Sequence, residues 1–445
     1  MPQAPLHCQF PPHFVWGVAT SSFQIEGAAH ADGKGESVWD RFCKQPGAIA
    51  DASNGDIACD HYNRLEEDLD LIASLGVNCY RFSVAWPRVQ PLGQGNWNPK
   101  GLDFYERLVD GLKARGIQAF ATLNHWDLPQ GLQERGGWNE RNTVHRFVDY
   151  ARHVQARLGD RLDGLTTHNE PWVVAVLGHE QGSFAPGIKS RGIAAQVSHH
   201  LLLSHGLALQ ALRADGARSP LGIVLNLSSC VPATAMPADI AAARMADARG
   251  RRWYADPLFK GCYPDEVLAE LGADAPIVQP GDMAAIEQPM DYLGVNYYAR
   301  TVVAASGADW DARQRGLPVT DMGWEIYPQG LADLLCLLHR DYPGLPPVYV
   351  TENGGAFKDQ AVVNGRVQDD DRIAYLREHI AAVASALQQG VPMAGYMVWS
   401  LMDNFEWASG YQKRFGIVHV DYRTLARTPK ASADWYRDFL KAWRG

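Results

Sequence analysis

Residues 79–126 read CYRFSVAWPRVQPLGQGNWNPKGLDFYERLVDGLKARGIQAFATLNHW. The two ends of this stretch, Cys79–Trp86 and Gln118–Trp126, are short runs rich in apolar and aromatic residues, which is typical of buried strands. Between them a loop rich in Gly and Pro precedes Leu102–Arg115, where apolar residues recur at helical spacing. This order predicts two parallel strands joined by a crossover helix.

The same unit of strand, loop and helix recurs along the rest of the chain. Further strand-like runs are Phe14–Thr20, Gly164–Glu170, Leu221–Ser228, Tyr292–Tyr298, Pro347–Glu352 and Gly395–Leu401. Further helical patterns are Leu65–Leu75, Thr143–Leu158, Ile193–Arg213, Leu331–Asp341, Arg372–Gln389 and Ala431–Trp443. Eight strands that alternate with at least seven helices favour a single (β/α)8 barrel, the TIM-barrel fold, over residues 1–445.

An open, doubly wound sheet would show the same alternation of strands and helices. Such a sheet would carry a phosphate-binding fingerprint after its first strand, GxGxxG or GxxxxGK[ST], and Gly27, Gly33 and Gly35 do not have that spacing. We therefore expect the barrel, with long loops at the carboxyl ends of its strands. The expected loops are Gly27–Asn63, Glu170–Gly192 and Ala299–Pro328.

The composition is that of an ordinary globular protein with a large core, since 46% of the residues are hydrophobic and 20% are charged. With 41 Lys and Arg against 50 Asp and Glu, the net charge is −9. This charge argues against nucleic acid or an anionic membrane surface as a partner and favours small neutral molecules. The 14 tryptophans are compatible both with core packing and with stacking against sugar rings.

Cysteine usage and the first residues favour a reducing compartment. Seven cysteines are scattered without a CxxC pair, so we expect neither a disulfide framework nor structural zinc. Residues Met1–Phe10 lack the basic and apolar regions of a signal peptide, and no apolar run approaches the ~20 residues of a membrane span. The expected location is therefore cytoplasmic.

Two of the predicted strands each deliver a carboxyl group to the rim of the barrel. The fourth strand ends Thr167-His168-Asn169-Glu170-Pro171, and the seventh ends Val350-Thr351-Glu352-Asn353-Gly354. Active sites of such barrels lie at this rim. Either glutamate alone could cap a helix or form a salt bridge, but the pair indicates acid/base or nucleophilic chemistry on an acetal. That chemistry needs one carboxyl group protonated and the other ionised.

A cation in the barrel mouth could set the two carboxyl groups apart. Arg81 lies in the second strand, within Tyr80-Arg81-Phe82-Ser83. A guanidinium beside one glutamate would keep that glutamate anionic, as a nucleophile requires. Arg81 could also form an interior salt bridge that holds the barrel, and the two roles are compatible.

Three other kinds of catalysis fit the sequence less well. His125, His168 and His179 could join the carboxylates around a metal, but no HExxH motif occurs, and no histidine pair lies at helical spacing beside a carboxylate. The GxSxG elbow of serine hydrolases is absent, as is a nicotinamide-binding motif. We expect neither a catalytic metal nor a cofactor.

The other strand ends supply side chains suited to a neutral sugar. Amide, imidazole and carboxylate groups match the hydroxyl edge of a pyranose, and indole rings match its apolar face. These residues are Gln24 after the first strand, His125 and Trp126 at the end of the third, Asn296 and Tyr298 at the end of the sixth, and Trp399, Glu406 and Trp407 in and after the eighth. Each alone could be structural, but their shared place on one rim favours a sugar site.

Five separated motifs resemble those of glycoside hydrolase family 1. Residues 167–171 resemble the family's T-x-N-E-P acid/base motif, and residues 350–354 resemble its (V/I)-T-E-N-G nucleophile motif. Residues 14–27, FVWGVATSSFQIEG, are similar to its N-terminal signature, and residues 80–83 and 404–407 match two further blocks. The resemblance extends from about Phe10 to the C-terminus.

The resemblance implies a retaining mechanism. Glu352 would be the nucleophile that forms a glycosyl-enzyme, and Glu170 would protonate the leaving oxygen and then act as base toward water. The retaining geometry places the two carboxyl groups roughly 5–5.5 Å apart. Arg81 and Tyr298 would contact the nucleophile.

The resemblance also assigns residues to the two halves of the substrate. Asn169 would bond the 2-hydroxyl of the glycone, while Gln24, His125 and Glu406 would hold its 3-, 4- and 6-hydroxyls. Further residues expected at the glycone are Trp126, Asn296, Trp399, Trp407 and Phe415, and those expected on the aglycone side are Trp172, His179 and Trp324.

The sequence favours an unphosphorylated β-glycoside as substrate. Relatives that act on 6-phosphorylated sugars replace the Glu-Trp pair, whereas Glu406 and Trp407 are present here, and a carboxylate would repel a phosphate dianion. Lys413 lies nearby in the sequence and leaves a phosphate site open. A sugar-binding relative without activity would lack one of the two glutamates, and Glu170 and Glu352 are both present.

We therefore expect a β-glucosidase with side activity on β-galactosides and β-fucosides. The expected partners are small-molecule β-glycosides, either cello-oligosaccharides or aryl and alkyl glucosides, and the first of these would give the enzyme a role in cellulose degradation. The sequence leaves the natural aglycone and the oligomeric state open.

Overall fold

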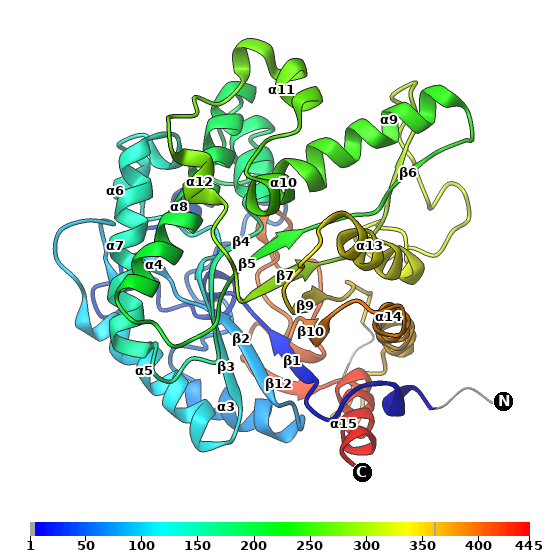
Figure 1. Ribbon diagram of the computed structural model, residues 1–445. Helices are drawn as coiled ribbons and strands as arrows, with labels where there is room; N and C mark the ends of the chain where they lie inside the picture. Colours follow the sequence, from blue (N-terminus) through cyan, green and yellow to red (C-terminus); the bar gives the residue numbers. More distant parts are fainter. Residues whose placement is uncertain (1–4, 360–361) are drawn as a thin grey trace.

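A closed barrel of eight parallel strands forms the centre of the computed structural model, which describes residues 5–359 and 362–445 (Figure 1). The strands are β1 Val15–Ala19, β2 Cys79–Ser83, β3 Gln118–Asn124, β4 Gly164–Asn169, β5 Leu221–Asn226, β7 Tyr292–Asn296, β9 Val348–Asn353 and β10 Met393–Trp399. Their order around the barrel is β1-β10-β9-β7-β5-β4-β3-β2. The predicted (β/α)8 barrel is confirmed, with a strand at each predicted position.

The barrel strands are almost wholly buried, because helices cover the outside of the sheet and side chains fill its interior. Some predicted runs continue beyond the hydrogen-bonded ladder. The run Cys79–Trp86 passes the end of β2, because its last apolar residues lead into the short helix α4 (Trp86–Val89). Hydrophobicity thus marks the buried segment, whereas the ladder ends where the rim loop begins.

Long helices pack around the barrel at the seven predicted positions (Figure 1). They are α3 Leu65–Ser74, α5 Pro99–Ala114, α7 Arg141–Leu158, α8 Arg191–Ala214, α13 Pro328–Asp341, α14 Asp370–Gln388 and α15 Ala431–Arg444. Each buries one apolar face; in α7, Val144, Phe147 and Val154 recur at helical spacing and are fully buried. Among the described residues, no helix is both long enough and apolar enough to cross a membrane.

The connection between β5 and β7 differs from the other crossovers. The sequence predicts no helix there, whereas this fully described stretch holds four short ones. They are α9 Pro237–Asp247, α10 Trp253–Lys260, α11 Asp265–Leu271 and α12 Asp282–Ile286, with the turns η4 Ala248–Arg252 and η5 Gly272–Asp274. These helices were missed because they give no clear helical period. In α9 only Ala243 is buried and in α11 only Val267, whereas α10 is buried along most of its length and contains Pro257.

The three predicted rim loops are not free of regular structure. Gly27–Asn63, Glu170–Gly192 and Ala299–Pro328 contain, in that order, α2 Val38–Phe42, η3 Val173–Glu180 and β8 Thr301–Val303. The π-helical segment η3 is apolar along most of its length, so its sequence lacks an amphipathic pattern. The strand β8 is three residues long and pairs in parallel with the distant β6 (Cys230–Pro232).

The remaining elements are short. They are η1 Leu6–Gln9, α1 Ser22–Ile25, α6 Gln130–Gln133, η2 Gly137–Asn139, η6 Trp407–Ser409, β11 Val418–Asp421 and β12 Ala426–Pro429. All seven cysteines are free thiols.

The first and last segments of the described chain pack against each other (Figure 1). The ring of Trp16 in β1 lies 4.8 Å from that of Phe10, 5.1 Å from that of Phe439 and 6.2 Å from that of Trp443. The helix α15 thereby covers β1, the strand that closes the barrel by pairing with both β2 and β10.

Candidate active site

Glu352 lies at the carboxyl end of β9, where two donors hold its carboxyl group. Arg81 Nη1 donates to Oε1 at 2.6 Å, and the Tyr298 hydroxyl donates to Oε2 at 2.7 Å. Arg81 comes from β2 and is 1% exposed, so this ion pair is shielded from water. One bond to each oxygen fixes the group in a single orientation that suits an anion.

A glycine lets the strand of Glu352 approach its neighbour closely. A Cβ at Gly354 would lie 1.7 Å from the carbonyl oxygen of Trp399 at the end of β10. Any larger residue would push apart the two segments that carry Glu352 and Trp399, so the Glu-Asn-Gly sequence has a steric basis here.

Glu170 follows β4 in contrasting surroundings. Its Oε1 accepts a hydrogen bond from Asn296 Nδ2 at 2.6 Å, and the residue is 5% exposed. Burial, followed by the charge of Glu352, raises the pKa of Glu170 to about 8, although Asn296 and Arg81 act in the opposite direction. Glu170 therefore keeps its proton at neutral pH, as a general acid must.

Asn169 connects the two glutamates to His125. The Asn169 Oδ1 accepts hydrogen bonds from Arg81 Nη2 at 2.6 Å and from Asn296 Nδ2 at 3.1 Å. This fixes the orientation of the amide, so Asn169 Nδ2 donates to His125 Nε2 at 3.1 Å. Burial holds the pKa of His125 well below its usual value, and the neutral ring then carries its proton on Nδ1. That atom is buried and has no hydrogen-bond partner among the described residues.

Gln24 and Glu406 form the far edge of the predicted sugar site. Gln24 lies in α1, and its Nε2 donates to Asn404 Oδ1 at 3.0 Å and to the Phe405 carbonyl at 2.9 Å, with Glu406 Oε2 at 3.4 Å. Burial, followed by the charge of Glu352, raises the pKa of Glu406 to about 8. A protonated Glu406 can both donate and accept at neutral pH, whereas the sequence suggested an ionised acceptor.

Three indole rings surround His125. The His125 ring is nearly parallel to those of Trp399 and Trp407, at 5.9 and 6.0 Å, and the rings of Trp126 and Trp407 lie 4.4 Å apart. Trp126 Nε1 donates to the Asn169 carbonyl at 2.9 Å. These rings give the site apolar walls, whereas Trp16 and other tryptophans fill the core.

The opposite side of the nucleophile carries a second aromatic group. The Tyr298 ring lies 5.3 Å from that of Trp324 and 6.1 Å from that of Phe415. Trp324, predicted on the aglycone side, therefore lies beside the Tyr298 ring, whose hydroxyl bonds Glu352. Phe415, predicted at the glycone, is buried against the same tyrosine.

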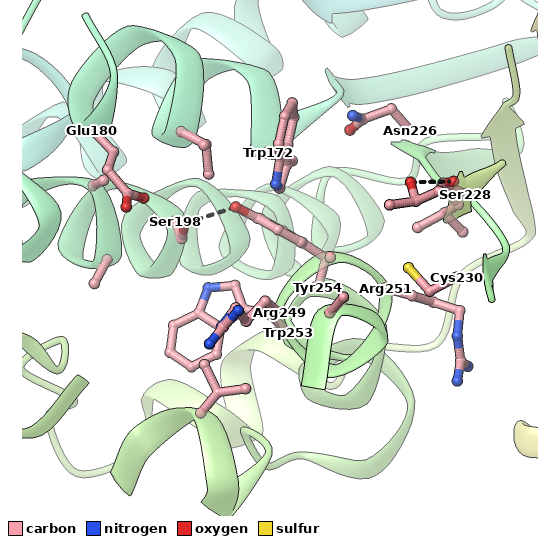
Figure 2. A pocket seen from close by; sticks show the side chains of 18 of the residues that line it. Trp172, Glu180, Ser198, Asn226, Ser228, Cys230, Arg249, Arg251, Trp253 and Tyr254 are labelled. Atoms are coloured by element: carbon pink, nitrogen blue, oxygen red, sulfur yellow. Dashed lines mark hydrogen bonds between the residues drawn. The ribbon is translucent and has the colours of Figure 1, made fainter. Parts of the chain in front are cut away.

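The other two predicted aglycone residues lie in different surroundings. Trp172 lines a cavity of about 710 Å³ together with Asn296 and Tyr298 (Figure 2). His179 is packed within η3, where its Nδ1 donates to the Val174 carbonyl at 2.7 Å, and burial lowers its pKa to about 4. Trp172 therefore shares a cavity with the two residues that bond the glutamates, whereas His179 is held inside the helical segment.

Backbone irregularities coincide with the site. The β4–β5 pairing shifts register between Thr166 and Asn169, and the β7–β9 pairing shifts between Val295 and Asn296. Glu170 has a left-handed φ of 51°. Bulges and left-handed residues turn side chains away from the regular pleat, and they cluster at functional sites.

Sequence reasoning missed two residues that take part in this arrangement. Asn226 ends β5 and lines the cavity beside Trp172 (Figure 2). The fifth strand was the one from whose end no residue was predicted, so the strand-end rule would have found it. Asn404 was quoted within a motif without a role, and its Oδ1 accepts from Gln24.

At the mouth of the barrel, the protonated carboxyl group of Glu170 and the Arg81-bound carboxyl group of Glu352 lie among amides, a neutral imidazole and indole rings. This arrangement can protonate a glycosidic oxygen while it stabilises the positive charge that develops at the anomeric carbon. Within the described ranges, no three or more His, Cys, Asp or Glu side chains are grouped to hold a metal ion. The class defined by fold and site is that of the glycoside hydrolases.

The chain belongs to glycosyl hydrolase family 1, whose model matches residues 6–444. It is 49% identical over 438 residues to the β-glucosidase of Agrobacterium sp. (strain ATCC 21400), covering 97% of this chain and 95% of that one. It is 44% identical over 460 residues to the bifunctional β-D-glucosidase/β-D-fucosidase of Bifidobacterium breve, with 97% and 98% covered. The solved structure of the virulence factor SghA from Agrobacterium tumefaciens matches with a TM-score of 0.95 at 48% identity and 99% of both chains. The chain is a glycoside hydrolase of the β-glucosidase type.

Proposed function

We propose that the enzyme hydrolyses terminal, unphosphorylated β-D-glucosides with retention of the anomeric configuration. The observation that carries the proposal is the contrast between the two glutamates. The carboxyl group of Glu352 accepts hydrogen bonds from the Arg81 guanidinium and the Tyr298 hydroxyl. Burial and the charge of Glu352 instead raise the pKa of Glu170 to about 8. Retaining hydrolysis needs this division between an anionic nucleophile and a protonated acid.

In the first step the Glu352 carboxylate attacks the anomeric carbon. The bond from that carbon to the glycosidic oxygen breaks, and the oxygen takes the proton of Glu170, so the aglycone leaves as a neutral alcohol. The products are a glycosyl ester on Glu352 and an ionised Glu170. Asn296 Nδ2, which bonds Glu170 Oε1 at 2.6 Å, positions the acid throughout.

In the second step water enters where the aglycone stood. Glu170, now ionised, takes one proton from the water, whose oxygen bonds to the anomeric carbon as the ester to Glu352 breaks. Two inversions give net retention, and both glutamates return to their starting protonation states.

Glycone recognition would use side chains from separate rim segments. Asn169 Nδ2 can serve the 2-hydroxyl, because its Oδ1 already accepts from Arg81 and Asn296. His125 Nδ1–H supplies an unpartnered donor, and Gln24 and Glu406 form the far edge. A site built to hydrogen-bond hydroxyl groups discriminates against analogues that lack them.

Binding of a 6-phosphorylated sugar is disfavoured at the edge formed by Gln24 and Glu406. Two negative charges would lie against Glu406 and would repel the ionised form of its carboxyl group. Lys413 Nζ, the cation that the sequence left open for this role, donates to Asp321 Oδ2 at 3.0 Å and to the Asp321 carbonyl at 2.8 Å. Its charge is thus already paired.

The proposal includes side activity on β-fucosides and β-galactosides. The Bifidobacterium breve relative, named for both glucosidase and fucosidase activity, supports the first of these. A fucoside lacks the 6-hydroxyl and a galactoside inverts the 4-hydroxyl. A protonated Glu406 can donate or accept, so it can adapt to either change. The proposal also includes cello-oligosaccharides among the substrates. It keeps a cytoplasmic location, which suits the seven free thiols.

The proposal is tested by kcat/KM on aryl β-glucosides whose phenols differ in acidity. Glu170→Gln is expected to lose about 10²–10⁴-fold on poor leaving groups and far less on good ones, which need little protonation. Glu378→Gln, at an exposed position of α14, is the control and should match the parent. An equal loss of kcat/KM on all leaving groups would show that Glu170 is not the general acid. In the same panel, a preference for the glucoside 6-phosphate would overturn the substrate assignment.

A further inference from the structure

The cavity beside Trp172 extends from the carboxyl ends of β5 and β7, where Asn226 and Asn296 lie, to the outer helices (Figure 2). Its inner end is formed by Asn296, which bonds Glu170, and by Tyr298, which bonds Glu352. From there it extends between η3 and α8 on one side and η4, α10 and α11 on the other, and we call this space the side chamber. A leaving oxygen that receives its proton from Glu170 would hold its substituent at the mouth of this chamber.

The walls of the side chamber are largely apolar. On α8, Ala194 and Ala195 lie on the face that also carries Arg191 and Ser198, and their small side chains leave the space open. Apolar surface on the other walls comes from Trp172, Trp253, Val267 and Leu271. The rings of Trp172 and Tyr254 face the same space in Figure 2.

Most hydroxyl groups in the walls already have partners within the protein. Ser198 Oγ lies 2.9 Å from the Tyr254 hydroxyl. Ser228 Oγ lies 2.8 Å from Thr301 Oγ1 and donates to the Ala299 carbonyl at 3.0 Å. A second sugar ring, with a hydroxyl on most of its carbons, would leave many of its hydrogen bonds unmade in this chamber, which carries a free-energy cost.

The outer rim of the chamber is charged but balanced. Arg191 and Arg249 both pair with Glu270, each at 2.7 Å, and Glu180 adds an exposed carboxyl group. A third guanidinium in the lining, that of Arg251, pairs with Asp247 and Asp341, so each lining arginine already has a carboxyl partner and the rim has little net attraction for an ionic ligand. The rim therefore does not favour a charged aglycone.

We propose that the side chamber receives the aglycone and selects β-glucosides with extended, neutral aromatic aglycones of two or more rings over those whose aglycone is a second sugar. The inference rests on the proposed function, since it assigns the leaving group of that reaction. About 710 Å³ lies within the range of pockets that hold drug-sized molecules. Each further aromatic ring would exchange water for the apolar surface of α8, α10 and α11.

The test measures the binding of unreactive sulfur-linked analogues to the parent enzyme. Phenyl, 2-naphthyl, 4-biphenylyl and glucosyl 1-thio-β-D-glucosides are titrated by calorimetry and as competitive inhibitors of 4-nitrophenyl β-glucoside hydrolysis. Affinity is expected to rise about tenfold or more from the phenyl to the biphenylyl compound. The glucosyl compound is expected to bind more weakly than the biphenylyl one.

Two variants locate the effect in the chamber. Ala195→Leu fills it from α8, and Leu271→Phe fills it from the half-buried end of α11. Each variant is expected to bind the biphenylyl compound about tenfold more weakly than the parent, and to change the affinity for the phenyl compound by less than about twofold. Ala214→Leu adds the same volume at the exposed C-terminal end of α8 and should change neither.

The outcomes separate this inference from the proposed function. Failure to hydrolyse any β-glucoside would overturn the proposed function, while the calorimetric affinities would still decide the chamber's role. If the enzyme hydrolyses β-glucosides, three results would each overturn the chamber assignment alone. The first is equal affinity across the aryl series, and the second is tighter binding of the glucosyl compound than of the biphenylyl one. The third is an affinity gradient that stays unchanged in both variants.

Discussion

Glu170 and Glu352 carry the same chemical group, and their neighbours give them different properties. A guanidinium and a phenol donate to Glu352. Glu170 meets a neutral amide instead, and burial is the largest cause of its raised pKa. The roles therefore follow from the immediate surroundings of each side chain, in the way that burial and neighbouring charges generally separate paired carboxyl groups.

The Tyr298 hydroxyl can be removed without emptying the site. Tyr298→Phe deletes the 2.7 Å bond to Glu352 Oε2 and leaves the ring in place. Because hydrogen bonds to charged groups contribute about 1.5–3 kcal/mol, kcat/KM on an aryl β-glucoside is expected to fall about 10–10²-fold.

The adjacent tyrosine is the matched control. The Tyr297 hydroxyl donates to the Tyr327 carbonyl at 2.8 Å and not to a carboxyl group. Tyr297→Phe is expected to affect stability while kcat/KM stays within about twofold. Equal kcat/KM losses in the two variants would show that Tyr298 acts through packing alone.

At the scale of the element, the segment after β10 carries Glu406 and depends on buried charges behind it. Asp403 accepts from Lys430 Nζ at 2.7 Å and from Arg414 Nη1 at 2.5 Å. Lys430 immediately precedes α15 and also pairs with Asp359. Buried charges are tolerated only when they are paired, so this cluster ties the segment after β10 to the last helix.

Removal of Lys430 is expected to destabilise the fold strongly. Lys430→Met leaves Asp403 and Asp359 buried without its charge, and breaking a buried pair in this way costs about 3–5 kcal/mol. Urea unfolding measures the loss. Lys441→Met, at an exposed position of α15, should stay within about 0.5 kcal/mol of the parent. A Lys430→Met variant as stable as this control would show that the cluster contributes nothing to stability.

Elements with a long, regular pattern could be predicted from the sequence, and irregular ones could not. The motifs that end β4 and β9 located Glu170 and Glu352, because an apolar run followed by a polar residue marks the rim of a barrel. The side chamber could not be predicted, since its walls include η3, α10 and α11, which lack a clear helical period. Asn226 also escaped notice, although it occupies a strand end like the others.

At the scale of the whole molecule, the barrel brings together groups that are distant in the chain. Arg81 bonds Asn169 across 88 positions and Glu352 across 271, and Gln24 bonds Asn404 across 380. Motifs within the sequence identified these residues, but only closure of the barrel specifies the hydrogen bonds between them. The raised pKa of Glu170, which burial causes, therefore belongs to the folded state and affects its stability.

The raised pKa of Glu170 predicts a pH-dependent cost to folding. Below pH 4.5 both states hold the proton. Between pH 4.5 and about 8 the unfolded chain releases it while the folded enzyme retains it, so stability falls as pH rises. Glu170→Gln lacks this effect. Its Tm relative to the parent is expected to increase from pH 5 to pH 8, on the order of a few degrees, and to level off above that.

The control for this experiment is a carboxyl group at the surface. Glu180→Gln should keep a constant Tm difference from the parent across the same range, because Glu180 is exposed. A constant difference for Glu170→Gln as well would mean that folding does not alter the proton affinity of Glu170.

The central claim is that Glu352 forms a covalent bond to the sugar, and trapping that bond tests it most directly. A 2,4-dinitrophenyl 2-deoxy-2-fluoro-β-glucoside has a good leaving group, and its fluorine slows both steps by destabilising positive charge at the anomeric carbon. The glycosyl-enzyme is therefore expected to accumulate, to add one fluoroglucosyl group to the mass of the chain, and to carry that group on the peptide containing Glu352. A label on Glu170, or no label together with α-glucose as the first product from an ordinary β-glucoside, would contradict the account.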